Sequence, residues 1–106
     1  MSARDLNLVI TSRGVADLRQ IYLHTIDRWG EEQATSYEER IRAAINHLTL
    51  NPHMGSRDRR AESNVRSFSL EHHTIYYRFD EANIYVLRVV HYRQEFRSTM
   101  LVEAED

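Results

Sequence analysis

Two short stretches in the C-terminal half of the chain hold most of the residues that could do chemistry. Residues 71–80 read EHHTIYYRFD, with two adjacent histidines, two adjacent tyrosines and an arginine, and residues 91–94 read HYRQ. Histidine changes its charge near neutral pH, and beside a tyrosine it could transfer protons in catalysis. The alternative is that EHHTIYYRFD is a structural strand of a small sheet, one face of which binds a partner.

Side-chain alternation favours the structural interpretation of residues 71–80. In an extended strand His72 and His73 point to opposite faces, whereas a metal site needs both on one side together with other ligands. We therefore expect one histidine at the edge of the core, one on the surface, and no metal or other cofactor. The alternation also predicts a core face with Ile75, Tyr77 and Phe79 and a recognition face with Thr74, Tyr76 and Arg78.

The composition excludes several kinds of catalytic site. The 106 residues include no cysteine, and all fourteen basic residues are arginine. Disulfides, cysteine-based zinc sites and thiol nucleophiles are excluded, as are a lysine-dependent phosphate loop and a Schiff base. The net charge of −2 is too small to predict nonspecific nucleic-acid binding. Without a signal-peptide core or a long apolar run, we expect a soluble cytoplasmic protein.

Two apolar stripes at helical spacing predict a pair of helices. Residues 6–11 alternate like a short strand, and Thr11 or Ser12 can then cap the first helix. The break at Gly30 is so short that the helices should form an antiparallel hairpin, which ends at Asn51-Pro52. We expect Trp29 in the core, where Trp29→Ala should cost about 3–5 kcal/mol. The stripes are Val15, Leu18, Tyr22, Ile26 and Trp29, then Ala34, Tyr37, Ile41, Ala44, Ile45 and Leu48.

The rest of the chain predicts a polar loop at 53–64 and then strands. Helices followed by strands indicate one α+β domain over residues 1–106, with the tail from about residue 97 unassigned. The predicted fold is an N-terminal strand and an antiparallel two-helix hairpin packed on one face of a three- to four-stranded antiparallel sheet. The other face of the sheet is expected to be open. The predicted strands are 65–70, 74–79 and 84–91, joined by turns near 71–73 and 80–83.

Most of the chain, from Asp17 to Phe96, resembles a known family. The segments DLRQIYLHTIDRWGEEQATSYEERIRAAINHLTLNPHMG, HHTIYYR and VLRVVHYRQEF are similar to the ParE branch of the ParE/RelE superfamily, the toxins of type II toxin–antitoxin modules. The most specific parts are Trp29-Gly30 followed by Gln33-Ala34, Asn51-Pro52 with Gly55, and His91-x-Arg93-Gln94-Glu95.

The resemblance implies a helical hairpin against an antiparallel sheet, and it implies partners. A ParD-type antitoxin would wrap its C-terminal segment along the helices and sheet, while its N-terminal part dimerises and binds operator DNA. In the ParE branch the usual target is DNA gyrase, stalled on cleaved DNA. In the RelE branch it is messenger RNA, cut on the ribosome.

The resemblance also suggests where the target is contacted. His91, Arg93 and Gln94 match the terminal motif of the family and are our candidates for poisoning the target. RelE-type enzymes generally supply arginines and lysines from the sheet, often with a C-terminal tyrosine. This chain has no lysine and no tyrosine after Arg93, and His73 or Thr74 stands near the place of a strand arginine.

That departure predicts no catalytic residues and no enzymatic activity. The alternative is an endonuclease that resembles YoeB and uses His91 and Tyr92 for acid–base chemistry.

Antitoxin contacts are expected on both layers of the fold. Arg88 interrupts an apolar strand, so it needs a partner or an open face. It should lie either beside Arg78 on the uncovered face, where antitoxin carboxylates would pair with both, or in an internal salt bridge with Glu71 or Glu95. The candidates for antitoxin binding are Leu23, Leu50, Tyr76, Arg78 and Arg88.

Overall fold

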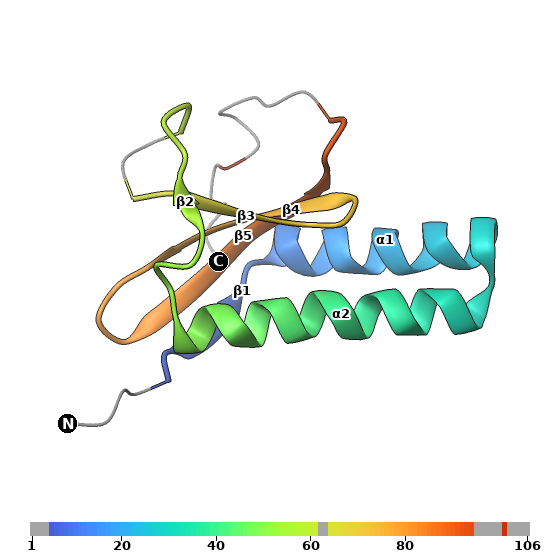
Figure 1. The fold of residues 1–106 in the computed structure, drawn as a ribbon, viewed down its shortest axis with the longest axis horizontal. Helices are drawn as coiled ribbons and strands as arrows, with labels where there is room; N and C mark the ends of the chain where they lie inside the picture. The colour runs from blue at the N-terminus through green and yellow to red at the C-terminus, as the bar shows by residue number, and fades with distance from the viewer. Residues whose placement is uncertain (1–4, 62–63, 95–100, 102–106) are drawn as a thin grey trace.

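A helical hairpin covers one face of a sheet in the computed structural model, which describes residues 5–61, 64–94 and 101 (Figure 1). The sheet order is β1-β5-β4-β3-β2. This confirms the predicted α+β class. However, the sheet has five strands and is mixed, because β1 pairs in parallel with β5. The elements are β1 (Asn7–Ile10), α1 (Ser12–Trp29), α2 (Glu31–Leu50), β2 (Ser56–Arg57), β3 (Arg66–Leu70), β4 (His73–Phe79) and β5 (Asn83–His91).

The extra strand β2 lies inside the segment predicted as a loop. It has two residues and pairs with β3 through Ser56↔Ser67 and Arg57↔Arg66. Backbone hydrogen bonds make this pairing without any apolar alternation, so the side-chain pattern gives no signal for it. The tight turn at 80–83 is confirmed, since Oδ1 of Asp80 accepts hydrogen bonds from the N–H groups of Ala82 and Asn83.

Thr11 and Gly14 attach the start of α1 to the sheet. The Thr11 hydroxyl accepts a hydrogen bond from the Gly14 N–H at 3.1 Å, as a helix cap does, and donates to the Leu87 carbonyl of β5 at 2.9 Å. A Cβ at Gly14 would lie 2.9 Å from the Ile10 side chain and 3.0 Å from the Val86 carbonyl oxygen. Glycine is therefore needed at position 14 for the helix to approach β1 and β5 this closely.

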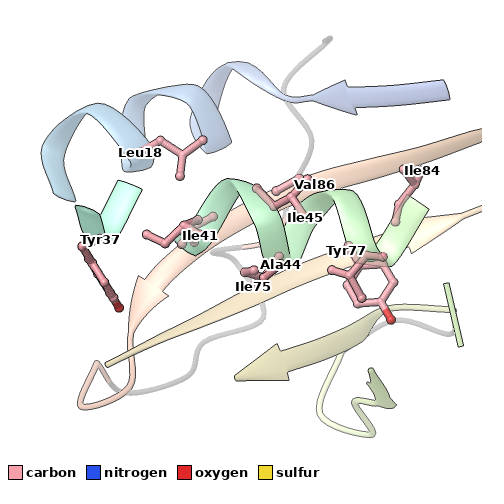
Figure 2. Close-up of a cluster of buried hydrophobic side chains, with 11 residues drawn as sticks. Leu18, Tyr37, Ile41, Ala44, Ile45, Ile75, Tyr77, Ile84 and Val86 are labelled. Carbon is pink, nitrogen blue, oxygen red and sulfur yellow. The ribbon is translucent and has the colours of Figure 1, made fainter. Parts of the chain in front are cut away.

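The main core lies between α2 and the helix-facing side of the sheet (Figure 2). All six residues of the second apolar stripe are buried, as predicted. From the sheet, Ile75 and Tyr77 point into this cluster and Phe79 packs against it, which confirms the predicted core face of β4. The buried members of the cluster are Leu18, Tyr37, Ile41, Ala44, Ile45, Leu48, Ile75, Tyr77, Ile84, Val86 and Val89.

The buried hydroxyl of Tyr77 organises the loop that follows α2. It donates a hydrogen bond to the Pro52 carbonyl at 2.6 Å and accepts one from the Gly55 N–H at 2.9 Å. A Cβ at Gly55 would lie only 2.5 Å from this hydroxyl. The spacing Asn51-Pro52 with Gly55 therefore has a structural cause in the core.

The other face of the sheet is not open as predicted. A second cluster of buried residues, Val65, Tyr76, Leu87 and Val90, lies there, with Leu101 packed against it. Tyr76, an antitoxin candidate, is only 5% exposed. Apolar side chains from the segment before β3 and from Leu101 cover this tyrosine, which the pattern of β4 alone could not show.

The apolar stripe of α1 is only partly buried. The buried residues are Gly14, Leu18 and Thr25, so the inner face is rotated by about one residue from the prediction. Val15 is 53% exposed, and Trp29 is 70% exposed. The prediction that Trp29 lies in the core is wrong, because it ends α1 at the tip of the hairpin, beyond the sheet (Figure 1).

Candidate functional site

The chain turns back on itself where β5 ends. The Tyr92 N–H donates to the His72 carbonyl at 2.8 Å, and the Gln94 N–H donates to the His91 carbonyl at 2.9 Å. Nε of Arg93 lies 3.0 Å from the Tyr92 hydroxyl. The turn therefore brings the three predicted target-contacting residues, His91, Arg93 and Gln94, together with Tyr92 on an exposed corner of the molecule.

His91 is held in one tautomer by this turn. The backbone N–H of Arg93 donates to Nδ1 of His91 at 3.1 Å. A backbone N–H is always a donor, so Nδ1 is an acceptor and the neutral ring carries its proton on Nε2. Nε2–H can donate a hydrogen bond, but it has no lone pair with which to remove a proton. His91 is therefore arranged as a donor rather than as a general base acting through Nε2.

A cavity of about 310 Å³ lies beside His91, between the helical hairpin and the β3–β4 turn. Four histidines line it: His24 from α1, His72 and His73 from the turn and the start of β4, and His91 from β5. The rings of His72 and His91 are nearly parallel with centroids 6.5 Å apart, and His73 meets His91 edge-on at 5.4 Å. We call this cavity the histidine pocket.

His73 is the most buried of these histidines. The Tyr37 hydroxyl lies 2.7 Å from its Nδ1 atom. Burial, and after it the positive charges that His91, His72 and His24 would carry, together lower the pKa of His73 to about 4. At neutral pH the ring is therefore uncharged. The predicted split into one core-edge and one surface histidine is confirmed, because His72 is exposed.

The acid at the rim of the pocket is already occupied. Glu71, at positive φ in the β3–β4 turn, lies 2.6 Å from Nε and 3.3 Å from Nη2 of Arg40. Among the described residues that line the pocket, Glu71 is the only carboxylate. The four histidines thus share a cavity whose one acid is paired with Arg40, which also lines it.

Sequence reasoning missed the contribution of α1 to this site. Asp17, Gln20, Ile21 and His24 line an adjoining cavity that also touches His73 and His91. Their spacing of three, four and seven residues places them on one face of the helix. This mixed polar stripe was the available signal, but it is weaker than the apolar one beside it.

Arg88 points toward α1 and away from Arg78. Its guanidinium pairs with Asp17 at 2.6 and 3.0 Å, and Asp17 also accepts the Val89 N–H at 2.9 Å. The register shift between Tyr76 and Tyr77 adds one residue to β5 near this point and changes its alternation. The expectation that Arg88 shares the uncovered face with Arg78 is therefore wrong.

An internal salt bridge is what Arg88 forms, although its partner is neither of the acids we considered. Glu71 pairs with Arg40, and Glu95 lies outside the described residues. The Arg78 guanidinium lies over the Tyr85 ring at 4.2 Å, on the face opposite the helices.

The two apolar antitoxin candidates on the helices are exposed. Leu23 is 47% exposed and Leu50 is 58% exposed. Within residues 5–61, 64–94 and 101, no three histidine, aspartate or glutamate side chains are placed so that they could hold a metal ion together. Over the same residues, neither helix is long and apolar enough to cross a membrane.

Comparison with known proteins decides the family. The sequence model of the ParE toxin of the parDE type II toxin–antitoxin system matches residues 8–96, which contain the whole hairpin, strands β2 to β5, all of β1 except its first residue, and the turn at His91. The chain belongs to the ParE toxin family. The resemblance to ParE in residues 17–55, 72–78 and 86–96 is thereby confirmed.

Curated relatives and solved structures agree with this assignment. Toxin ParE1 of Mycobacterium tuberculosis is 34% identical over 96 residues, 90% of this chain and 95% of that protein. Toxin ParE1 of Caulobacter vibrioides is 29% identical over 89 residues, 84% of this chain and 92% of that protein.

Two solved structures share the fold. The chromosomal ParDE toxin–antitoxin system of P. aeruginosa matches with a TM-score of 0.71 and 25% identity, over 81% of this chain and 95% of that one. The toxin–antitoxin complex RelBE2 of M. tuberculosis has the same fold, with a TM-score of 0.63 and 18% identity over 88% of this chain and 98% of that one.

Proposed function

We propose that this ParE-family toxin inhibits DNA gyrase in the cytoplasm, holds it on cleaved DNA, and is neutralised by a ParD-like antitoxin. In the resulting hetero-oligomer the antitoxin contacts operator DNA. The observation that carries the proposal is the hydrogen bond from the Arg93 N–H to Nδ1 of His91, which removes the general base expected of a nuclease at this site. An exposed corner with Tyr92 and Arg93 supports toxicity through binding.

The arginines of the sheet support the same proposal. Cleavage of RNA by attack of a 2′-hydroxyl needs cations around the phosphate. Here Arg66 donates to the Gly55 carbonyl at 2.6 Å, Arg78 lies over the Tyr85 ring, and Arg88 is paired with Asp17. The guanidinium groups of Arg66 and Arg88 therefore direct donors at protein partners, which leaves the sheet fewer donors for a phosphate.

A messenger-RNA endonuclease is the second candidate. The observation that favours it is the contact between His91 and Tyr92, whose ring centroids are 4.8 Å apart. Under this alternative the turn would have to open and release Nδ1 of His91 before His91 could take up a proton through Nε2. It predicts translation arrest that His91→Ala abolishes.

The test is a gyrase supercoiling assay with purified toxin released from its antitoxin and shown to be folded. We expect lost supercoiling together with accumulated cleaved DNA. Arg93→Ala should relieve both effects while the fold and antitoxin binding are kept, whereas Arg59→Ala, which removes an exposed arginine from the loop before β3, should behave like the unaltered toxin. Transcripts cut by the folded toxin, with gyrase unaffected, would falsify the proposal.

A further inference from the structure

The histidine pocket has hydrogen-bond donors but lacks a matching acceptor among the carboxylates around it. Glu71 uses both oxygens on Arg40, at 2.6 and 3.3 Å. Asp17, in the adjoining cavity, accepts from Arg88 and from the Val89 N–H. Both acids are held by arginines rather than by the imidazoles of the pocket, whereas the neutral ring of His91 keeps a donor on Nε2.

We propose that the histidine pocket binds one carboxylate group, carried by an acidic side chain of the antitoxin. The proposal rests on the proposed function in naming the antitoxin as the partner. A carboxylate accepts hydrogen bonds from several donors at once. The exposed Trp29 and the ring of Tyr37 also line the pocket, where they can contact the apolar stem of such a side chain.

The charge of the pocket favours a single carboxylate over a nucleic-acid phosphate. Its lining includes one paired arginine and one paired acid, so with neutral imidazoles it has no net positive charge. Nucleic acids are attracted by clusters of lysine and arginine, which this pocket lacks. A single buried carboxylate needs only a few donors and one compensating proton.

Binding of the carboxylate should be coupled to proton uptake. An anion in the pocket favours the imidazolium form of its neighbours. The complex then holds more protons than the free toxin, so affinity is highest at acidic pH and falls as pH rises through the pKa values of the bound state.

The ionisable groups that face the pocket come from both helices and from the sheet. They are His24 from α1, Tyr37 and Arg40 from α2, Glu71 and His72 from the β3–β4 turn, His73 from β4 and His91 from β5, with Asp17 nearby.

The first test uses the folded toxin and two probes, a capped glutamate (acetyl-Glu-amide) and inorganic phosphate. The imidazole resonances of the histidines are followed by NMR as each probe is added. We expect the glutamate to shift the signals of His72 and His91 but not those of His47, which is exposed on α2 outside the pocket. Response to phosphate alone, or to neither probe at millimolar concentration, would overturn the proposal.

The second test measures antitoxin affinity with the double variant His24→Gln/His72→Gln, which leaves His91 and His73 in place. We expect the dissociation constant to rise about tenfold and its increase between about pH 6 and pH 8 to flatten. His47→Gln should change neither. An unchanged affinity and pH profile for the double variant would overturn the proposal.

Gyrase inhibition by the free double variant separates this proposal from the proposed function. Inhibition should be unaltered, because the variant keeps His91, Arg93 and Gln94, and the hydrogen bond that His72 makes to the turn is accepted by its backbone carbonyl. Loss of antitoxin affinity with intact inhibition supports the carboxylate site. A toxin that never affects gyrase contradicts only the proposed function, and the affinity measurement still decides the carboxylate site.

Discussion

The two helices of the hairpin carry similar apolar stripes but use them differently. Every stripe residue of α2 is buried against the sheet or α1, whereas α1 leaves Val15 and Trp29 largely exposed and holds the sheet with Gly14, Leu18 and the carboxylate of Asp17. Helical periodicity shows that a helix has an apolar face. It does not show whether this chain or a partner covers that face.

The largest effect should come from α2. Ile41→Ala removes a side chain that is 1% exposed at the centre of the core, so we expect the free energy of unfolding to fall by about 3–4 kcal/mol. Val15→Ala, the matched change on α1, should cost less than about 1 kcal/mol. Chemical denaturation of the two variants checks the contrast, and equal losses would mean that both helices are packed alike.

The second largest effect on stability should come from the salt bridge between Asp17 and Arg88, which attaches α1 to the sheet. Asp17→Asn removes the charge that pairs with Arg88, in a pair whose side chains are 13% and 15% exposed. We expect a loss of about 3 kcal/mol, because a nearly buried guanidinium loses its counter-charge. Glu38→Gln is the control: its 3.7 Å contact with Arg42 is more exposed and should be worth less than about 0.5 kcal/mol. A loss as small as the control's would show that Asp17 does not anchor the helix.

A smaller effect on the free energy of unfolding should appear as the pH is lowered. It arises at His73 of β4, which contacts Tyr37 of α2. The pKa of His73 is lowered to about 4 in the folded state, so between about pH 6.5 and pH 4 the unfolded chain takes up a proton that the folded chain does not. Stability is therefore complete above about pH 6.5 and is lost as pH falls, by roughly 1 kcal/mol per pH unit.

The variant His73→Gln has no ionisable group at this position and should lose stability less steeply over the same range. His47→Gln, on the exposed side of α2, should follow the unaltered protein. Denaturation curves from pH 7 to pH 4 give the slopes, and identical slopes for all three proteins would remove His73 as the cause.

The smallest effect on stability is expected at Trp29. Because 70% of its surface is exposed, Trp29→Ala should lower the free energy of unfolding by less than about 1 kcal/mol, well below the loss expected for a core tryptophan. If an antitoxin side chain occupies the histidine pocket, which Trp29 lines, the same change should weaken antitoxin binding by about 2 kcal/mol or more, as for other exposed tryptophans at interfaces. Chemical denaturation measures the stability of the variant, and titration with the antitoxin measures its affinity. A large loss of stability with unchanged affinity would contradict the surface role of Trp29.

The residues of the family motifs fall into two groups: some build the fold, and others are exposed on the surface. Asn51-Pro52 with Gly55 shapes the loop around the Tyr77 hydroxyl, and Gly30, at φ 96°, joins the helices in a conformation that other residues rarely adopt. Trp29 and the turn from His91 to Gln94 are exposed. Local rules therefore predicted the ends of the helices at Gly30 and Asn51-Pro52, whereas the need for Gly55 depends on the distant Tyr77 hydroxyl and the apolar spacing of Trp29 wrongly indicated burial.

The hairpin, the core face of β4 and the buried stripe of α2 could be predicted from the amino-acid sequence, because side-chain periodicity within one element reports which residues share a face. The pairing of Asp17 with Arg88 across 71 residues and the shared pocket of His24, His73 and His91 follow from the packing of the helices on the sheet. That packing also leaves Trp29 exposed, because the tip of the hairpin extends beyond the sheet. Contacts between distant elements depend on how the layers are placed, and no local pattern encodes that placement.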